Sequence, residues 1–331
     1  MRFVHAGLLG LLLTFVLVPT VSAQMTSLAS PQGDPRRPFG THEQILKWID
    51  SYRLEPQPKH LPQAVKSMSQ LGLFRDSDAS GIYVGFMAGV IASNPKDAKK
   101  LVTGMFPMPP EDQSAIIKAI AYSGRPDWKD LMGQFVERMP ARKTLIDSYL
   151  HGKAKLLHEL PLESGPAAVD TLWGYYFATG SHEPVRRIVT ALRWSSDKAD
   201  VNKLTVGSIS KWTLANNASR DKGLLDLLRD EQRLSSHDKH VRAELKEIVE
   251  AAETFETGKI RKEALAAIEE LKRKGPQPNN AWSTAAYWGS TAIAVGCVVA
   301  SAAGQVAIGL PCIITGALSS AAVKLFNGSP Q

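Results

Sequence analysis

The sequence predicts an all-α protein, an irregular α-solenoid of helix-turn-helix repeats that ends in a C-terminal apolar helical hairpin. Prolines and glycines stand where helices would begin and end, as at Pro62 and Gly124. A helix-turn-helix pattern recurs every 28 or 29 residues. Strand signals are nearly absent from residues 41–274, which contain no Asn-Gly hairpin and no sustained period-two alternation.

The N-terminus has the three parts of a secretory signal peptide, residues 1–23. Arg2 is the only Lys or Arg among the first 35 residues, an apolar run follows from Ala6 to Val18, and residues 21–23 are small enough for signal peptidase. We expect cleavage between Ala23 and Gln24, and hence a periplasmic or secreted protein. An uncleaved anchor is the alternative, but the apolar run is shorter than the ~20 residues of a spanning helix.

A helical body is expected after the signal peptide. Residues 24–40 are rich in Pro, Gly and Ser, which predicts a disordered leader. A repeat-like helical domain is expected over residues 41–235, and it begins with a capping box formed by Thr41 and Gln44. The formal charge of +7 includes Arg2 and is scattered along the chain, which argues against a nucleic-acid partner.

The recurring pattern ends one helix and opens the next. Its copies start at Ala92, Ala121, Leu150 and Ala178, and the third copy is truncated. Repeats of about this length are typical of α-solenoids, in which each unit buries its apolar face by stacking on a neighbour. An irregular helical bundle is the alternative, because any all-helical chain has turns at such spacing.

Residues 236–274 predict one long amphipathic helix, or two helices with a break near Gly258. A heptad seam runs through Val241, Leu245, Ile248, Ala252 and Phe255. Such a seam packs either on its own protein or on a partner helix. This segment, or the hairpin that follows it, could therefore carry oligomerisation.

Residues 275–331 contain the predicted apolar helical hairpin. The 49 residues from Gly275 to Val323 include no Asp, Glu, Lys, Arg or His. Small residues recur at every fourth position, at Ala292, Gly296, Ala300 and Gly304, and this spacing lets helix backbones approach closely. We expect two antiparallel helices, 282–303 and 306–326, each near the ~20 residues that cross a bilayer.

The only two cysteines of the chain, Cys297 and Cys312, lie at equal distances from the expected Gly304-Gln305 turn. Residues placed in this way can face each other across an antiparallel hairpin. An even cysteine count in an exported chain favours a disulfide. Two buried free thiols are the alternative.

Three locations for the hairpin stay open: across a membrane, within the core of the last helical unit, or inserted like a toxin into the membrane of another cell. Two observations weaken the first. Ala, Gly and Ser insert less strongly than Leu or Ile, and Lys272-Arg273-Lys274 would remain on the outer side, against the positive-inside preference.

The sequence predicts no catalytic, cofactor or metal site. His237 and His240 lie one helical turn apart and could hold a metal, but they lack a further ligand at matching spacing. Ser208 and Lys211 fit S-x-x-K at a frequency close to chance. The aromatic side chains of Trp173, Tyr176 and Phe177 share one helix face, which predicts core packing rather than a ligand groove.

Two stretches resemble an uncharacterised family of exported α-helical bacterial proteins, over about residues 80–230. They are Gly85-Phe-Met-Ala-Gly-Val-Ile-Ala-Ser-Asn-Pro95 and Leu172-Trp-Gly-Tyr-Tyr-Phe-Ala-Thr-Gly180. The resemblance implies a repeat-like helical domain and a bacterial source. It implies no function and no active-site residues.

These observations predict a non-enzymatic exported helical protein. Its body would be an interaction scaffold for a protein partner or membrane lipid, and its hairpin would be the anchor. The alternative is a membrane-active, pore-like or toxin-like protein whose glycine-zipper hairpin is the effector. An enzyme with a site assembled from scattered residues is a third class.

Overall fold

The computed structural model describes residues 34–76, 79–254 and 257–274, and within these ranges the protein is helical without any strand. This confirms the all-α prediction. Three short 3-10 helices matter below: η4 (Leu157–Glu159), η5 (Leu162–Ser164) and η6 (Ala191–Trp194). The α-helices of the described residues are α1 (His42–Ser51), α2 (Leu61–Gln70), α3 (Gly81–Ser93), α4 (Ala98–Met105), α5 (Gln113–Tyr122), α6 (Trp128–Gly133), α7 (Lys143–Leu150), α8 (Pro166–Thr179), α9 (His182–Thr190), α10 (Val201–Ala218), α11 (Lys222–Arg233), α12 (Lys239–Glu253) and α13 (Thr257–Lys274).

The first helix begins where the capping box predicts. The Thr41 side chain accepts a hydrogen bond from the Gln44 backbone N–H, and the Gln44 side chain bonds back to the cap backbone. The chain before it is also folded, because residues 34–40 form turns and Phe39 is buried against Trp48. The boundary predicted at residue 40 between leader and body is therefore too late, since a single buried aromatic ties this stretch to the core.

The predicted repeat turns lie at helix ends. Helices α3, α5, α7 and α8 end at Ser93, Tyr122, Leu150 and Thr179, so successive ends are 28 or 29 residues apart. Gly124, Gly152 and Gly180 follow three of these ends with φ of 66°, 71° and 68°, the left-handed conformation that glycine adopts at least cost. In the third copy, the helix after the turn is replaced by η4 and η5.

The N-terminal half departs from the nearest-neighbour stacking of a solenoid. In a solenoid, α3 would pack mainly on α5, the first helix of the next unit. It packs most extensively on α8 instead, and α8 begins a unit two further along the chain than the unit of α5. The pair is parallel, because Gly81 lies against Ala167 and Gly85 against Thr171. This interface rests on a glycine contact, formed by Gly81, Gly85 and Gly89 of α3 and Gly174 of α8.

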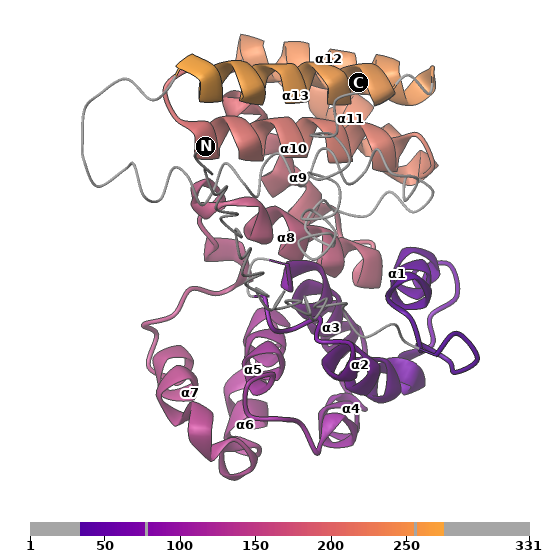
Figure 1. The fold of residues 1–331 in the computed structure, drawn as a ribbon, viewed down its shortest axis with the longest axis vertical. Helices are drawn as coiled ribbons and strands as arrows, with labels where there is room; N and C mark the ends of the chain where they lie inside the picture. The colour runs from indigo at the N-terminus through magenta and orange to yellow at the C-terminus, as the bar shows by residue number, and fades with distance from the viewer. Residues whose placement is uncertain (1–33, 77–78, 255–256, 275–331) are drawn as a thin grey trace, which may run out of the picture.

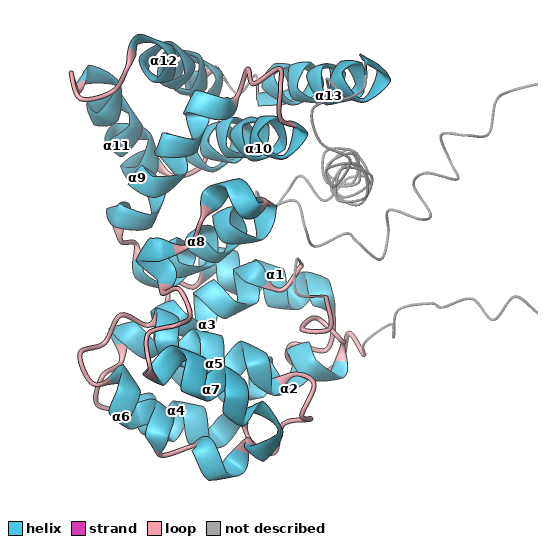
Figure 2. Ribbon diagram, turned by 90° about the vertical axis from the view of Figure 1, so that its left-hand side faces the viewer, coloured by secondary structure: helices cyan, strands magenta, loops and turns pink. Residues whose placement is uncertain are grey.

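From α8 onward, each helix packs on the next ones in the chain. Helix α10 contacts α8 and α9 on one side and α12 and α13 on the other. Figures 1 and 2 show α8, α10 and α12 following one another along the long axis of the molecule. Residues 236–274 form two helices, α12 and α13, and the described seam residues Val241, Leu245, Ile248 and Ala252 are buried. The seam therefore packs on the body of its own chain.

Within the described ranges, no helix has both the length and the apolar character needed to cross a membrane. The signal peptide and the hairpin lie outside these ranges, as do Ala23, Gln24, Ala292, Gly296, Cys297, Ala300, Gly304 and Cys312. Their predicted roles stay predictions.

Candidate functional site

A group of interacting polar and charged side chains lies where α1, α8 and α11 meet. We call Asp50, Arg53, Tyr176, Arg220 and Asp221 the junction cluster. The Asp221 carboxylate forms an ion pair with the Arg53 guanidinium. It also accepts a hydrogen bond from the Tyr176 hydroxyl at 2.5 Å. Arg53 also lies over the Tyr176 ring, 5.2 Å from its centroid. The other Asp221 oxygen accepts the Leu224 backbone N–H at 3.1 Å and caps α11.

The protonation of the junction cluster follows from burial. Burial raises the pKa of Asp50, the negative charge of Asp221 raises it further, and Arg220 opposes both. Burial and the hydrogen bond to Asp221 raise the pKa of the Tyr176 hydroxyl, so this group stays neutral. Both Asp221 oxygens are engaged within the protein. The junction cluster is therefore arranged to hold three helices together rather than to exchange protons with a substrate.

We expect Asp221→Ala to lower the free energy of unfolding by about 2–3 kcal/mol. A lost helix cap typically costs ~1 kcal/mol, and a lost hydrogen bond to a charged group costs ~1.5–3 kcal/mol, reduced here because Arg53 is partly exposed. Urea unfolding followed by circular dichroism measures the difference. The matched control is Asp226→Ala on the same helix, expected within ~0.5 kcal/mol of wild type. Equal losses in the two variants would contradict a special role for Asp221.

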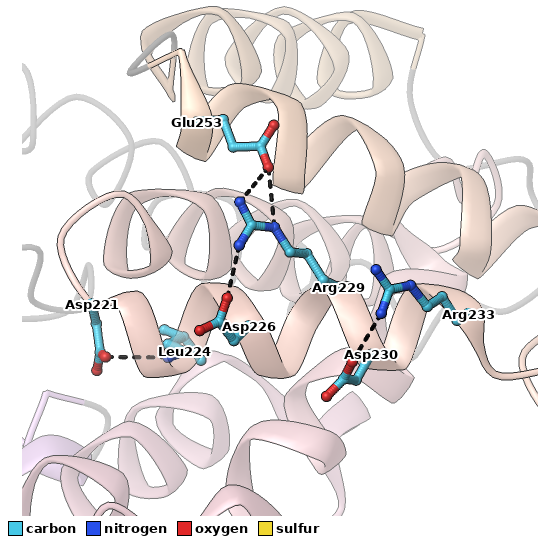
Figure 3. Close-up of polar contacts among 7 residues, drawn as sticks. All are labelled: Asp221, Leu224, Asp226, Arg229, Asp230, Arg233 and Glu253. Carbon is cyan, nitrogen blue, oxygen red and sulfur yellow. Dashed lines mark hydrogen bonds and ion pairs between the residues drawn. The ribbon is translucent and has the colours of Figure 1, made fainter.

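Asp226 is a suitable control because it belongs to an exposed network of ion pairs, which Figure 3 draws. Arg229 donates to Asp226 on its own helix and to Glu253 on α12, both at 2.7 Å, and Arg233 lies 3.3 Å from Asp230. These side chains are substantially exposed. Exposed ion pairs typically contribute ~0–1 kcal/mol, so this network adds little to stability.

The two histidines flagged as weak metal ligands contact different groups. His237 Nε2 lies 2.9 Å from Glu231 of α11, which also binds Arg186 at 2.8 Å. His240 Nε2 lies 3.2 Å from the Ser195 hydroxyl at the end of η6. Among the described residues, no group of three or more His, Cys, Asp or Glu side chains could hold a metal ion. His237 thus links the segment before α12 to α11, and His240 links α12 to the end of η6.

Ser195, His240 and Glu244 come together, but not as a catalytic triad. Glu244 lies 3.8 Å from His240 Nε2, which is also the nitrogen that faces Ser195. A triad carboxylate instead binds Nδ1 and leaves Nε2 to the serine. This geometry does not prepare Ser195 as a nucleophile.

The S-x-x-K pair on α10 also lacks the required electrostatics. Ser208 is buried. Lys211 binds Glu244 at 2.7 Å and Glu247 at 2.5 Å; burial lowers the pKa of its amine, but these two carboxylates outweigh that effect and raise it. A lysine that acts as a general base needs a lowered pKa. Lys211 therefore serves as an ion-pair partner of α12.

The sequence reasoning missed a second cluster, which lies inside the α3–α8 interface. Asp170 of α8 and Tyr83 of α3 are each 1% exposed, and the Tyr83 hydroxyl bonds His42 Nε2 of α1 at 2.6 Å. We call these three residues the buried acid cluster. The available signal was a charged residue within an otherwise uncharged stretch, because Asp170 is the only Asp, Glu, Lys, Arg or His between Gly165 and Gly180.

The predicted aromatic face is confirmed as core. Trp173, Tyr176 and Phe177 are all buried, and the Trp173 indole N–H donates to the Thr213 hydroxyl at 3.0 Å. These aromatic side chains are therefore part of the buried core.

Fold and site together define the class: an all-α protein whose described polar clusters join helices to one another. No family model matches the chain. Searches of curated proteins and of solved structures likewise find no match.

Proposed function

We propose that this protein is a non-enzymatic exported scaffold that binds a protein partner or membrane lipid through its helical body. The proposal takes residues 282–303 and 306–326 as an antiparallel anchoring hairpin, bridged by Cys297 and Cys312. It takes the layers from α8 to α13 as the solenoid-like part of the body. The described charged clusters favour a scaffold over an enzyme, because their groups pair with one another across helix boundaries.

The observation that carries the proposal is the attachment of α13. Helix α13 packs on α10 with Ile260 and Ile268 buried, and it ends at Lys274, the last residue before the charge-free segment. The helix that precedes that segment in the sequence is therefore attached to the body by buried contacts. An anchor attached in this way would hold the body at a defined position next to a membrane.

We expect the full-length protein to sediment with membranes and to stay there in high salt, whereas a chain ending at Lys274 is released to the soluble fraction. Charge-free arms of about 20 residues bind through apolar burial, which salt does not weaken. Fractionation of cells that make each version, followed by a salt wash, measures this. Release of both versions by salt would contradict the anchor.

Two controls separate the alternatives. Changing Lys272, Arg273 and Lys274 to Gln in the full-length protein should leave sedimentation unchanged, because the attachment is apolar. Thermal unfolding of the version ending at Lys274 should stay cooperative; loss of cooperativity would instead place the hairpin in the core of the body. Dye release from lipid vesicles by the full-length protein would favour the membrane-active alternative.

A further inference from the structure

The α3–α8 interface encloses a carboxyl group with no hydrogen-bond partner. Asp170 is 1% exposed, and neither of its oxygens bonds any described residue. The backbones are close here, since a Cβ added at Gly81 would lie 3.1 Å from the Asp170 Cβ. Buried polar groups are nearly always satisfied, so an orphaned carboxyl calls for a physical explanation.

The surroundings keep this carboxyl protonated. Burial raises the pKa of Asp170 well above its usual range. Burial also raises the pKa of Tyr83, and the proximity of Asp170 raises it further. An ionised carboxylate in this interface would carry an unpaired buried charge, which is far more costly than a neutral acid.

Burial alone accounts for the raised pKa of Asp170, and several charged groups on the helices packed against α8 have partners elsewhere. On α9, Arg186 binds Glu231, and Arg187 binds the Leu157 and Leu160 carbonyls and interacts with Glu183. On α10, Lys211 binds Glu244 and Glu247. The acid of η5, Glu163, is exposed, and His42 of α1 faces Tyr83. Tyr83 is thus the titratable group coupled to Asp170.

We propose that Asp170 makes the α3–α8 contact proton-controlled: the interface closes around the protonated carboxyl and opens when the proton is lost. Opening would separate α3, in which 11 of 13 residues are buried, from the helix on which it packs most extensively. The device regulates the body itself, so it does not depend on the anchoring function proposed above.

The sign of the pH dependence follows from proton linkage. The closed interface binds a proton that an open, hydrated Asp170 releases above its ordinary pKa of ~3.9. Rising pH therefore favours opening by up to about tenfold per pH unit, until the raised pKa of the closed form is reached. His42 acts in the opposite direction. Burial lowers its pKa to about 4, whereas an open, hydrated His42 has its ordinary pKa of ~6.5. Below about pH 6.5, opening therefore takes up a proton at His42 and is favoured by falling pH.

Hydrogen exchange measured by mass spectrometry tests this on the full-length protein between pH 7.5 and 8.5, which lies above the range in which an open His42 titrates. Rates are divided by the intrinsic chemical rates at each pH. We expect amides of α3 and α8 to show an opening equilibrium that rises up to about tenfold per pH unit. Amides of α11 and α12 should not follow. A flat profile in α3 and α8, or the same rise in every helix, would overturn the proposal.

Variants assign the effect to one carboxyl. Asp170→Asn, or Asp170→Leu if the amide does not fold, should make the α3 and α8 profiles flat. The control is Asp112→Asn, because Asp112 is similarly buried but one of its oxygens accepts the Ser69 hydroxyl at 2.5 Å; this variant should keep the wild-type slope. A slope that persists without Asp170 would overturn the assignment. If neither variant folds, isotope-edited infrared spectroscopy of the wild type decides, since a protonated aspartic acid band must persist at pH 7.

Discussion

Gly85→Ala is expected to destabilise the protein by about 3 kcal/mol or more, although it adds a single methyl group. The new Cβ would lie 1.9 Å from the Thr171 carbonyl oxygen, far inside contact distance. That atom belongs to the α8 backbone and cannot swing aside as a side chain can, so the two helices must separate. Overpacking a core typically costs ~1–3 kcal/mol, and a backbone clash lies at or above the upper end of that range.

Two other glycines give graded controls for Gly85. A Cβ at Gly89 meets the Ala178 Cβ at 2.6 Å and the Tyr175 carbonyl oxygen at 3.0 Å, so Gly89→Ala should cost less than Gly85→Ala. At Gly133 nothing lies within 4 Å, and Gly133→Ala should be neutral or should stabilise the helix by up to ~1 kcal/mol. Thermal unfolding of the three variants measures the order. Equal stability of the three variants would show that α3 and α8 do not pack in backbone contact.

Local structure was predictable because its signals lie within a few residues. The capping box at Thr41 needs Gln44 alone, and a left-handed glycine at Gly180 needs only the end of α8. The aromatic face of α8 follows from helical periodicity. Each of these features depends on residues within a turn or two of one helix. Each could therefore be predicted without knowledge of the rest of the chain, and the structure confirms all three.

The pairing of α3 with α8 was not predictable in the same way, because it joins residues about 90 positions apart. The small-residue spacing that the sequence analysis recognised in the C-terminal segment also occurs at Gly81, Gly85 and Gly89. There it brings two helices of the described body into backbone contact. Such spacing predicts close approach but does not name the partner helix. Asp170 was missed for the same reason, since its burial depends on that partner.

The repeat illustrates the same limit. The 28- or 29-residue recurrence locates helix ends correctly, yet it does not determine which helices pack together. From α8 onward sequence neighbours are also spatial neighbours, whereas α3 packs mainly on α8. Turn chemistry is encoded locally, but stacking depends on which apolar and glycine faces fit one another.

Trp173→Ala is expected to lower the free energy of unfolding by about 3–5 kcal/mol, the range for removing a buried Trp or Phe. Trp173 is 0% exposed, and its ring stacks on Phe177 with centroids 5.8 Å apart. Truncation would leave a cavity between α8 and α10 that the rigid glycine contact next to it hinders from closing. The midpoint of urea unfolding, followed by circular dichroism, measures the loss.

Trp173→Phe separates the polar part of this effect from the packing part. This variant keeps a ring but removes the indole N–H, which donates a hydrogen bond to the Thr213 hydroxyl. That hydroxyl still donates to the Ile209 carbonyl at 2.8 Å. Loss of the indole hydrogen bond should therefore lower the free energy of unfolding by only ~0.5–1.5 kcal/mol. Leu54→Ala is the control for a large apolar side chain outside the core, since Leu54 is 83% exposed, and it should change stability by less than ~0.5 kcal/mol. If Trp173→Ala costs no more than Leu54→Ala, then Trp173 does not lie in the core that joins α8 to α10, and the aromatic face of α8 would again be open to a ligand.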